Sequence, residues 1–179
     1  MTSITETRTA LPAGTWKADP VHSDIGFALD YMAGTFRGTF SRFTAELADG
    51  RLPGVAEVTS VQVKDANLEA HLQSPEFFDA ERHPELVFES REITRSGDEV
   101  TMSGEITIRG HTEPVEIRGT VTDEVGDPYG NTRFGFRLTA TVDRTAFGLN
   151  WNMPLPTGEP ALANEVRIEA DLQLVEAAA

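Results

Sequence analysis

The sequence predicts an all-β protein of eight or nine antiparallel strands, arranged as a barrel or a sandwich. Apolar and polar residues alternate with a period of two in segment after segment, which is typical of strands with one buried face and one wet face. Turn sequences rich in Gly, Asp and Asn, such as 96–98 and 126–131, separate these segments. The connections are therefore expected to be short, as in an antiparallel fold.

The strands follow one another along the chain. Trp16 begins a first short strand, and the second runs through Ile25, Phe27 and Leu29. Residues 35–47 are expected to form one strand, whose apolar positions change parity once and so predict a β-bulge. The remaining strands are expected at 55–65, 86–93, 99–109, 115–122, 133–142 and 166–174.

Two segments do not alternate. In residues 66–83 the apolar residues, among them Leu72 and Phe77, predict a helical excursion that Pro75 interrupts. Residues 152–164 contain three prolines and show no periodicity, so we expect a long loop before the last strand.

Composition indicates a single globular domain. Of the 179 residues, 39% are hydrophobic and 25% are charged, and we expect one barrel domain over residues 14–176 after a flexible tail of residues 1–13. The net charge of −14 opposes binding to nucleic acid or to anionic lipid surfaces. The lack of cysteine excludes disulfides, thiolate metal sites and a cysteine nucleophile.

The sequence also predicts where in the cell the protein is located. Residues 1–14 contain no apolar run of the length found in signal peptides, and no segment approaches 18 uninterrupted apolar residues. We therefore expect a cytoplasmic protein without stable membrane insertion.

Alternation cannot say whether the apolar faces of the strands meet in a filled core or surround a cavity. The interior of an eight-stranded barrel can be filled by side chains or can hold one small ligand. Both possibilities remain open on the pattern alone.

Five segments of the sequence are distinctive in their order and spacing. They are Asp19-Pro-Val-His-Ser-Asp-Ile-Gly-Phe27 with the following Gly34–Phe40, His71-Leu-Gln-Ser-Pro-Glu-Phe-Phe-Asp79 continuing to Ser90, Gly104–Thr112, Asp143-Arg-Thr-Ala-Phe-Gly-Leu-Asn-Trp151, and the closing strand from Asn164. In these segments the sequence resembles the YceI-like family of lipocalin-like barrels. The resemblance covers roughly residues 14–175. It implies a lipocalin-like β-barrel that encloses a polyisoprenoid, a quinone tail or another long aliphatic chain, often as a homodimer.

The resemblance, together with strand parity, nominates ligand-binding residues. Aromatic and aliphatic side chains suit an unbranched or methyl-branched chain, which offers no hydrogen bonds. The candidates are Phe27, Phe36, Phe40, Phe77, Phe78, Phe88, Met102, Phe134, Phe136, Phe147 and Trp151, with Arg144 as the best candidate for a polar head group ahead of Arg37, Arg109 and Arg137.

Enzyme signatures are weak. His22-Ser23-Asp24 contains the residue types of a hydrolytic triad, but adjacent strand residues point to opposite faces, so we expect the pair to tie the first strand to a neighbour. The four histidines show no metal-binding spacing, and no nucleotide motif is present. We expect a binding protein without cofactor or metal. A catalyst acting on a lipid inside the barrel and an interaction module with a filled core remain the alternatives.

Overall fold

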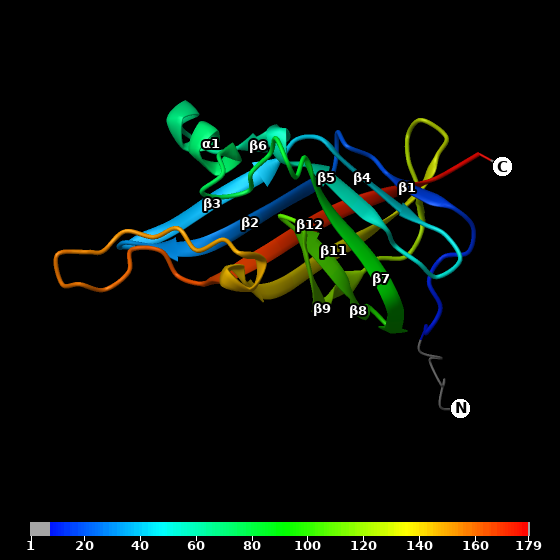
Figure 1. The fold of residues 1–179 in the computed structure, drawn as a ribbon. Helices are drawn as coiled ribbons and strands as arrows, with labels where there is room; N and C mark the ends of the chain where they lie inside the picture. Colours follow the sequence, from blue (N-terminus) through cyan, green and yellow to red (C-terminus); the bar gives the residue numbers. More distant parts are fainter. Residues whose placement is uncertain (1–7, 179) are drawn as a thin grey trace.

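The computed structural model describes residues 8–178, and within them nearly every element is a strand (Figure 1). The strands are β1 (Trp16–Ala18), β2 (Asp24–Tyr31), β3 (Gly34–Phe40), β4 (Phe43–Leu47), β5 (Gly54–Glu57), β6 (Val61–Gln62), β7 (Glu85–Ser96), β8 (Glu99–Ile108), β9 (His111–Val121), β10 (Val125–Gly126), β11 (Thr132–Asp143) and β12 (Glu165–Glu176). One α-helix, α1 (Ala66–Gln73), and two short 3₁₀ segments, η1 (Val58–Ser60) and η2 (Arg144–Phe147), complete the fold.

Eight of these strands close a barrel. Their order around it is β1-β4-β5-β7-β8-β9-β11-β12, and β12 returns to β1 through Trp16 opposite Glu176. Every pairing is antiparallel, and the longest ladder joins β11 to β12 from Arg133 to Asp143. The predicted antiparallel barrel is confirmed.

The same sheet extends outward from one end of this barrel through β2, β3 and β6, which we call the flare. Strand β12 pairs with β1 through residues 174–176 but with β2 through residues 167–171, and β3 and β6 continue outward from β2. In Figure 1 the β2–β3 hairpin projects away from the rest of the barrel, next to the loop that precedes β12.

The flare explains why two predicted strands are broken. The expected single strand 35–47 is two strands, β3 and β4, which part at Ser41 and Arg42 rather than at a bulge. The backbone N–H of Arg42 there donates to Ser60 Oγ at 3.0 Å. The expected strand 55–65 is likewise interrupted by η1, which separates β5 from β6.

The helical excursion is confirmed, although the α-helix is shorter than residues 66–83. The carboxylate of Asp65 caps its first turn by accepting from the N–H groups of Asn67 and Leu68 at 2.9 and 3.1 Å. The helix ends at Gln73, two residues before Pro75, because proline disfavours helical backbone in the residue before it. Turns carry the chain from there to β7.

Residues 152–164 form the predicted loop. The side chain of Asn152 pairs with the backbone of Leu162, donating to its carbonyl oxygen and accepting from its N–H, each at 2.9 Å. Backbone bonds also join the two arms of the loop, from the N–H of Leu155 to the carbonyl oxygen of Glu159 at 2.7 Å and from the N–H of Ala161 to that of Met153 at 2.8 Å.

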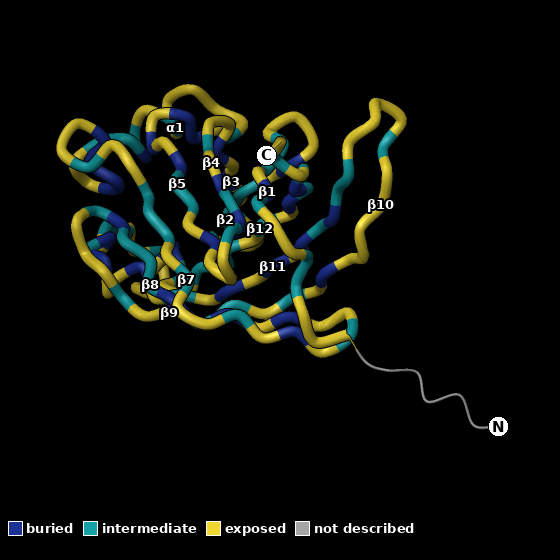
Figure 2. Tube along the Cα trace, turned by 90° about the vertical axis from the view of Figure 1, so that its right-hand side faces the viewer, coloured by how far each residue is buried: buried dark blue, intermediate teal, exposed yellow. Residues whose placement is uncertain are grey.

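Buried side chains form two clusters at opposite ends of the barrel, and buried and exposed residues alternate along the strands (Figure 2). We call the end of the barrel away from β2 and β3 the closed end. There, Phe134 contacts Trp16 edge-on with ring centroids 5.0 Å apart and lies 5.2 Å from Phe136. The second cluster lies beneath α1 and the loop before β12, and includes Phe40, Phe78 and Phe147.

Part of the expected N-terminal tail is tied to the closed end. Residues 1–7 lie outside the described residues, whereas Arg8 and Ala10 contact the barrel. The carbonyl oxygen of Arg8 accepts from the N–H of Gly97 at 2.8 Å, and buried Arg95 donates to the carbonyl oxygen of Ala10 at 3.2 Å. Arg95 also binds Asp123 Oδ1 at 3.0 Å.

Candidate ligand-binding cavity

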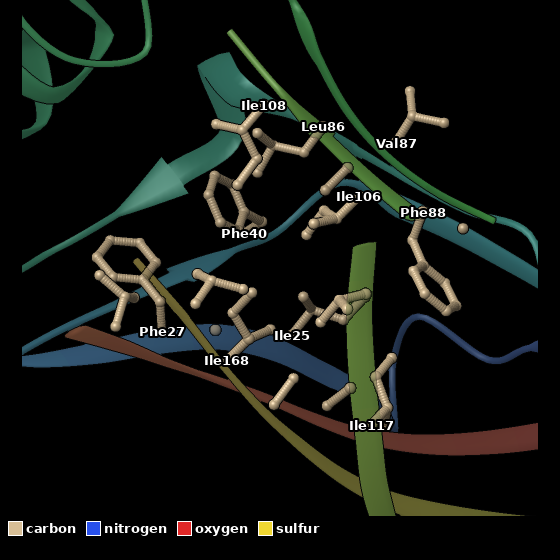
Figure 3. Close-up of a pocket in the computed structure, with 18 of the residues that line it drawn as sticks. Ile25, Phe27, Phe40, Leu86, Val87, Phe88, Ile106, Ile108, Ile117 and Ile168 are labelled. Carbon is tan, nitrogen blue, oxygen red and sulfur yellow. The ribbon is translucent and has the colours of Figure 1, made fainter. Parts of the chain in front are cut away.

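A cavity of about 190 Å³ lies inside the barrel between the two buried clusters. Among the side chains that line it, all except Thr139 and Arg144 are apolar. In Figure 3, Ile25, Phe40, Ile106 and Ile168 come from four different strands and point toward one another around this space. The interior of the barrel is therefore hollow at its middle and filled at its closed end.

The hollow follows from the size of the inward side chains. Midway along the barrel these are small at several strands, with Ala45 on β4, Ala56 on β5, Ala140 on β11 and Ala170 on β12 all lining the cavity. Larger residues fill the interior on either side, so the space left by the alanines is not taken up.

Exposure supports the same conclusion. The side chains of Ile25, Ile106, Ile117 and Ile168 line the cavity, and yet these residues keep more exposed surface than fully buried core residues do. Their exposed surface faces the cavity. Sequence reasoning did not nominate these isoleucines because it favoured aromatics, although each lies on the apolar parity of its strand.

Two segments outside the barrel ladder cover the cavity at the flared end: residues 66–84, which include α1, and residues 148–163. We call them the cover. The ring of Phe78 lines the cavity from the first segment and packs against Phe27 and Phe40, with centroids 6.3 and 6.0 Å apart. Leu149 lines it from the second segment.

The cover segments also contact each other directly. The His71 ring lies edge-on against Phe77 and Trp151, with centroids 4.9 and 4.8 Å apart, and Phe77 is 5.3 Å from Trp151. A carboxylate oxygen of Glu76 lies 2.5 Å from Nε2 of His71.

The structure brings half of the twelve nominated residues to the cavity wall: Phe27, Phe40, Phe78, Phe88, Phe147 and Arg144. The other six lie elsewhere. Phe77 and Trp151 are in the cover, and Phe36 packs against Phe27 and Tyr31 in the flare. Met102, Phe134 and Phe136 belong to the closed-end cluster, at most 2% exposed, and do not line the cavity. Strand parity gives the face of a residue, but not its height along the barrel.

The side chain of Arg144 binds backbone carbonyl groups. Its guanidinium donates to the carbonyl oxygens of Ala163, Leu149 and Trp151 at 2.8, 2.6 and 2.9 Å, and the residue is 4% exposed. Burial lowers the pKa of Arg144 from its usual value, an effect that neighbouring Asp143 partly opposes. Arg144 therefore fastens the second cover segment to η2, and its side chain also borders the cavity.

The other arginines considered for a head group lie outside the cavity. Arg37 and Arg137 border a shallow groove on the outer face of β3, β2, β12 and β11, together with the carboxylates of Asp24, Glu169 and Asp171. Arg137 is paired with Asp171 at 4.0 Å, and its side chain is 81% exposed.

His22 and Ser23 do not form a nucleophile and base pair. Ser23 Oγ accepts from the N–H of Gln173 at 2.9 Å, while His22 Nδ1 lies 2.7 Å from Asp19 Oδ2. Ser23 alone thus ties a strand to its neighbour, and that strand is the second one, β2, next to β12, whereas we expected the pair to tie the first strand. Within residues 8–178 no group of three or more His, Asp or Glu side chains is placed to hold a metal ion, and no helix there is long and apolar enough to cross a membrane.

Comparison with known proteins identifies the barrel. A UPF0312 protein of Staphylococcus epidermidis is 29% identical over 168 residues, which cover 87% of this chain and 94% of that protein. BcnA of Burkholderia cenocepacia matches with a TM-score of 0.75 at 23% identity, over 89% of this chain and 99% of that one. A polyisoprenoid binding domain from Saccharophagus degradans matches with a TM-score of 0.69 at 10% identity, over 93% of this chain and all of that one.

At 23% and 10% sequence identity, the two solved structures show that the fold is shared and nothing further. The family model of the YceI-like domain matches residues 16–174, from the first barrel strand into the last one. By that match, which spans the barrel, the flare and both cover segments, the chain belongs to the YceI-like family.

Proposed function

We propose that this protein binds a long apolar lipid, a polyisoprenoid or an isoprenoid quinone, inside the barrel without covalent attachment and without chemical change, as a carrier or store. The cavity is the observation that carries the proposal. Its wall offers an apolar chain contact on all sides and offers a substrate almost no polar groups that could act as acid, base or nucleophile.

An empty apolar cavity is costly. At roughly 24 cal/mol per Å³, a void of about 190 Å³ corresponds to about 4–5 kcal/mol of lost packing. Water does not recover this loss, because a buried water needs two to four polar partners. An apolar ligand recovers it and adds about 25 cal/mol for each Å² of its own surface that is buried.

The wall and the family support this chemical class of ligand. Branched aliphatic and aromatic side chains match the methyl branches and double bonds of an isoprenoid, and the related domain from Saccharophagus degradans is described as binding polyisoprenoid. Arg144 donates to three backbone carbonyls in this structure, so we place the apolar tail, rather than the head group, in the cavity.

The cavity is smaller than a long isoprenoid. An engineered apolar cavity of 150 Å³ takes one benzene molecule, so about 190 Å³ takes only a short piece of such a chain. A long ligand must therefore extend beyond the cavity, and the rest of its tail lies between the cover and the flared β2–β3 hairpin.

Native mass spectrometry of the purified protein, followed by organic extraction, tests the proposal. We expect a bound species that dissociates as an intact long-chain lipid at close to one copy per barrel. An empty protein that also fails to take up added polyprenol contradicts the proposal and favours an interaction module. Conversion of the added lipid into a product would instead show an enzyme.

We also propose that the protein forms a homodimer that covers apolar surface at the flared end. Met32 and Met153 are 62% and 54% exposed there. The N–H of Met32 donates to the carbonyl oxygen of Ala161, and the N–H of Ala161 donates to that of Met153, so the segments that contain the two methionines are linked. Light scattering should give twice the chain mass of 19.5 kDa, and a mass near 19.5 kDa at micromolar concentration contradicts the dimer.

A further inference from the structure

The barrel wall offers no easy passage to the cavity. Its strands are joined by backbone ladders around the whole circumference, and the closed end is filled by buried side chains such as Trp16 and Phe134. Passage between two strands would leave backbone groups without partners in an apolar interior. The cover is different, because its two segments contact each other through side chains and not through a ladder within the described residues.

One side chain joins both cover segments. Arg109 lies in the tight turn between β8 and β9, and its guanidinium donates from Nη1 to the carbonyl oxygen of Gly148 and from Nη2 to that of Pro75, each at 2.8 Å. Pro75 belongs to the first cover segment and Gly148 to the second. A planar guanidinium can hold two acceptors in different directions at once, whereas an ammonium group has a single nitrogen.

The backbone of the turn positions this side chain. Arg109 and Gly110 have φ angles of 51° and 73°, the pair of positive values that a two-residue type I′ hairpin requires. Such a hairpin on a rigid ladder holds the root of the Arg109 side chain in one place. The two carbonyl oxygens that it binds lie on segments with fewer backbone restraints.

The neighbours of Arg109 contact the same two segments. A Cβ atom at Gly110 would lie 2.9 Å from Cε1 of His83, which is in the first segment. A Cβ atom at Gly148, in the second segment, would lie 3.3 Å from the His111 ring. The turn is therefore in close contact with each segment beside the point where Arg109 binds it.

We propose that Arg109 is the positioning residue that holds the cover closed, and that release of its bonds to Pro75 or Gly148 is the step that lets an apolar ligand enter and leave. The inference rests on the proposed function, since it concerns passage of that ligand. It assigns Arg109 to the rate of exchange rather than to affinity, because the Arg109 side chain does not line the cavity.

Replacing Arg109 with methionine tests this role, since it removes the donors and keeps an apolar stem. The probe is all-trans-retinol, a fluorescent isoprenoid alcohol, transferred between the protein and phosphatidylcholine vesicles in a stopped-flow instrument. We expect both the uptake rate and the release rate to rise about tenfold or more, since a hydrogen bond from a charged donor contributes at least that factor. The dissociation constant should change less than threefold.

Arg91→Met is the matched control. Arg91 is an exposed arginine on β7 that pairs with Glu105 on β8, away from the cover. Its loss removes one positive charge and one ion pair but should leave both rates unchanged. Arg109→Lys, which keeps the charge, should give intermediate rates and serves in place of Arg109→Met if that variant does not fold.

Hydrogen exchange provides a measurement that does not depend on a ligand. Within the first cover segment, the N–H groups of Phe78 and Ala80 donate to the carbonyl oxygens of Leu72 and Gln73, each at 2.9 Å. In Arg109→Met, peptides spanning residues 72–83 and 148–163 should exchange faster, with β8 and β9 unchanged. A merely structural brace of the turn would instead speed exchange in β8 and β9.

The outcomes separate the two proposals. Retinol binding by both proteins with equal uptake and release rates overturns the role of Arg109 alone and leaves the proposed function standing. Failure of the unmodified protein to bind retinol or any added polyprenol contradicts the proposed function, and the inference about Arg109 falls with it.

Discussion

Ala140 on β11 lies directly opposite Ile168 on β12, and both residues line the cavity. The small side chain of Ala140 leaves the space next to Ile168 open. This pair relates the width of the cavity to single side chains on neighbouring strands, and it suggests a direct way to close the cavity without disturbing the barrel.

Ala140→Leu should fill part of the cavity and displace the ligand. We expect lipid recovered per barrel to fall by more than half, while the free energy of unfolding of the lipid-free protein stays level or rises by about 1 kcal/mol because a void is filled. Thr141→Leu is the control, since Thr141 is the next residue on β11 and is exposed. Quantitative mass spectrometry of extracts measures the effect, and equal lipid recovery from both variants would place the ligand elsewhere.

Phe136→Ala should mainly lower stability. Phe136 has no exposed surface and packs in the closed-end cluster, so its truncation should cost about 3–5 kcal/mol. Phe36→Ala, which truncates a partly buried ring in the flare, should cost less than half as much. Urea unfolding monitored by circular dichroism gives both values, and a loss below about 1 kcal/mol for Phe136→Ala would show that the closed end is loosely packed.

Arg144→Met should lower the free energy of unfolding by about 3 kcal/mol or more, because it leaves three backbone carbonyls without their donor in a buried site. Arg144→Lys should restore little of this, since one ammonium group cannot reproduce the planar arrangement of donors. Arg137→Met removes an exposed arginine and should change stability by less than about 0.5 kcal/mol. Full rescue by lysine in urea unfolding would mean that charge alone matters at position 144.

Acid should destabilise the closed end through Asp19 and Asp127. Arg133 donates to both carboxylates, at 2.8 and 2.7 Å. The bond from Arg133, followed by that from His22, holds the pKa of Asp19 far below its usual 3.8. The backbone N–H of Asn131, followed by Arg133, lowers the pKa of Asp127 to about 2.

A carboxyl group whose folded pKa is depressed stabilises the fold above its unfolded pKa, and this contribution is lost as the pH falls through the folded value. Thermal unfolding temperatures should therefore drop between about pH 4 and pH 2. Arg133→Met should be less stable at pH 7 and show a shallower drop over that range. A drop as steep as in the unmodified protein would assign the acid sensitivity to other carboxylates.

Much of the fold could be predicted because period-two alternation marks the buried face of each strand. Alternation could not show that residues 35–47 pass from the flare into the barrel at Ser41, since both β3 and β4 keep an apolar face on either side of the break. That break depends on contacts with Ser60, nearly twenty residues farther along the chain.

The cavity was harder to predict from sequence than the barrel. Phe136 and Leu138 share a face of β11, and yet Leu138 lines the cavity whereas Phe136 fills the closed end. Whether Phe136 or Leu138 lines the cavity depends on where small residues such as Ala45 and Ala56 lie on the other strands. Height along the barrel follows from strand stagger, which a single sequence does not display.

The pairing of β1 with β12 joins residues about 160 positions apart, and it orders events when the protein is made. Contacts between such distant segments form late, because the intervening chain must first be restrained. Until residues 165–176 have left the ribosome, β1 and β11 lack the strand that lies between them, and the cavity has no complete wall. The cavity can therefore form only after synthesis has passed β12, and before then the unpaired strand edges must be kept from aggregating.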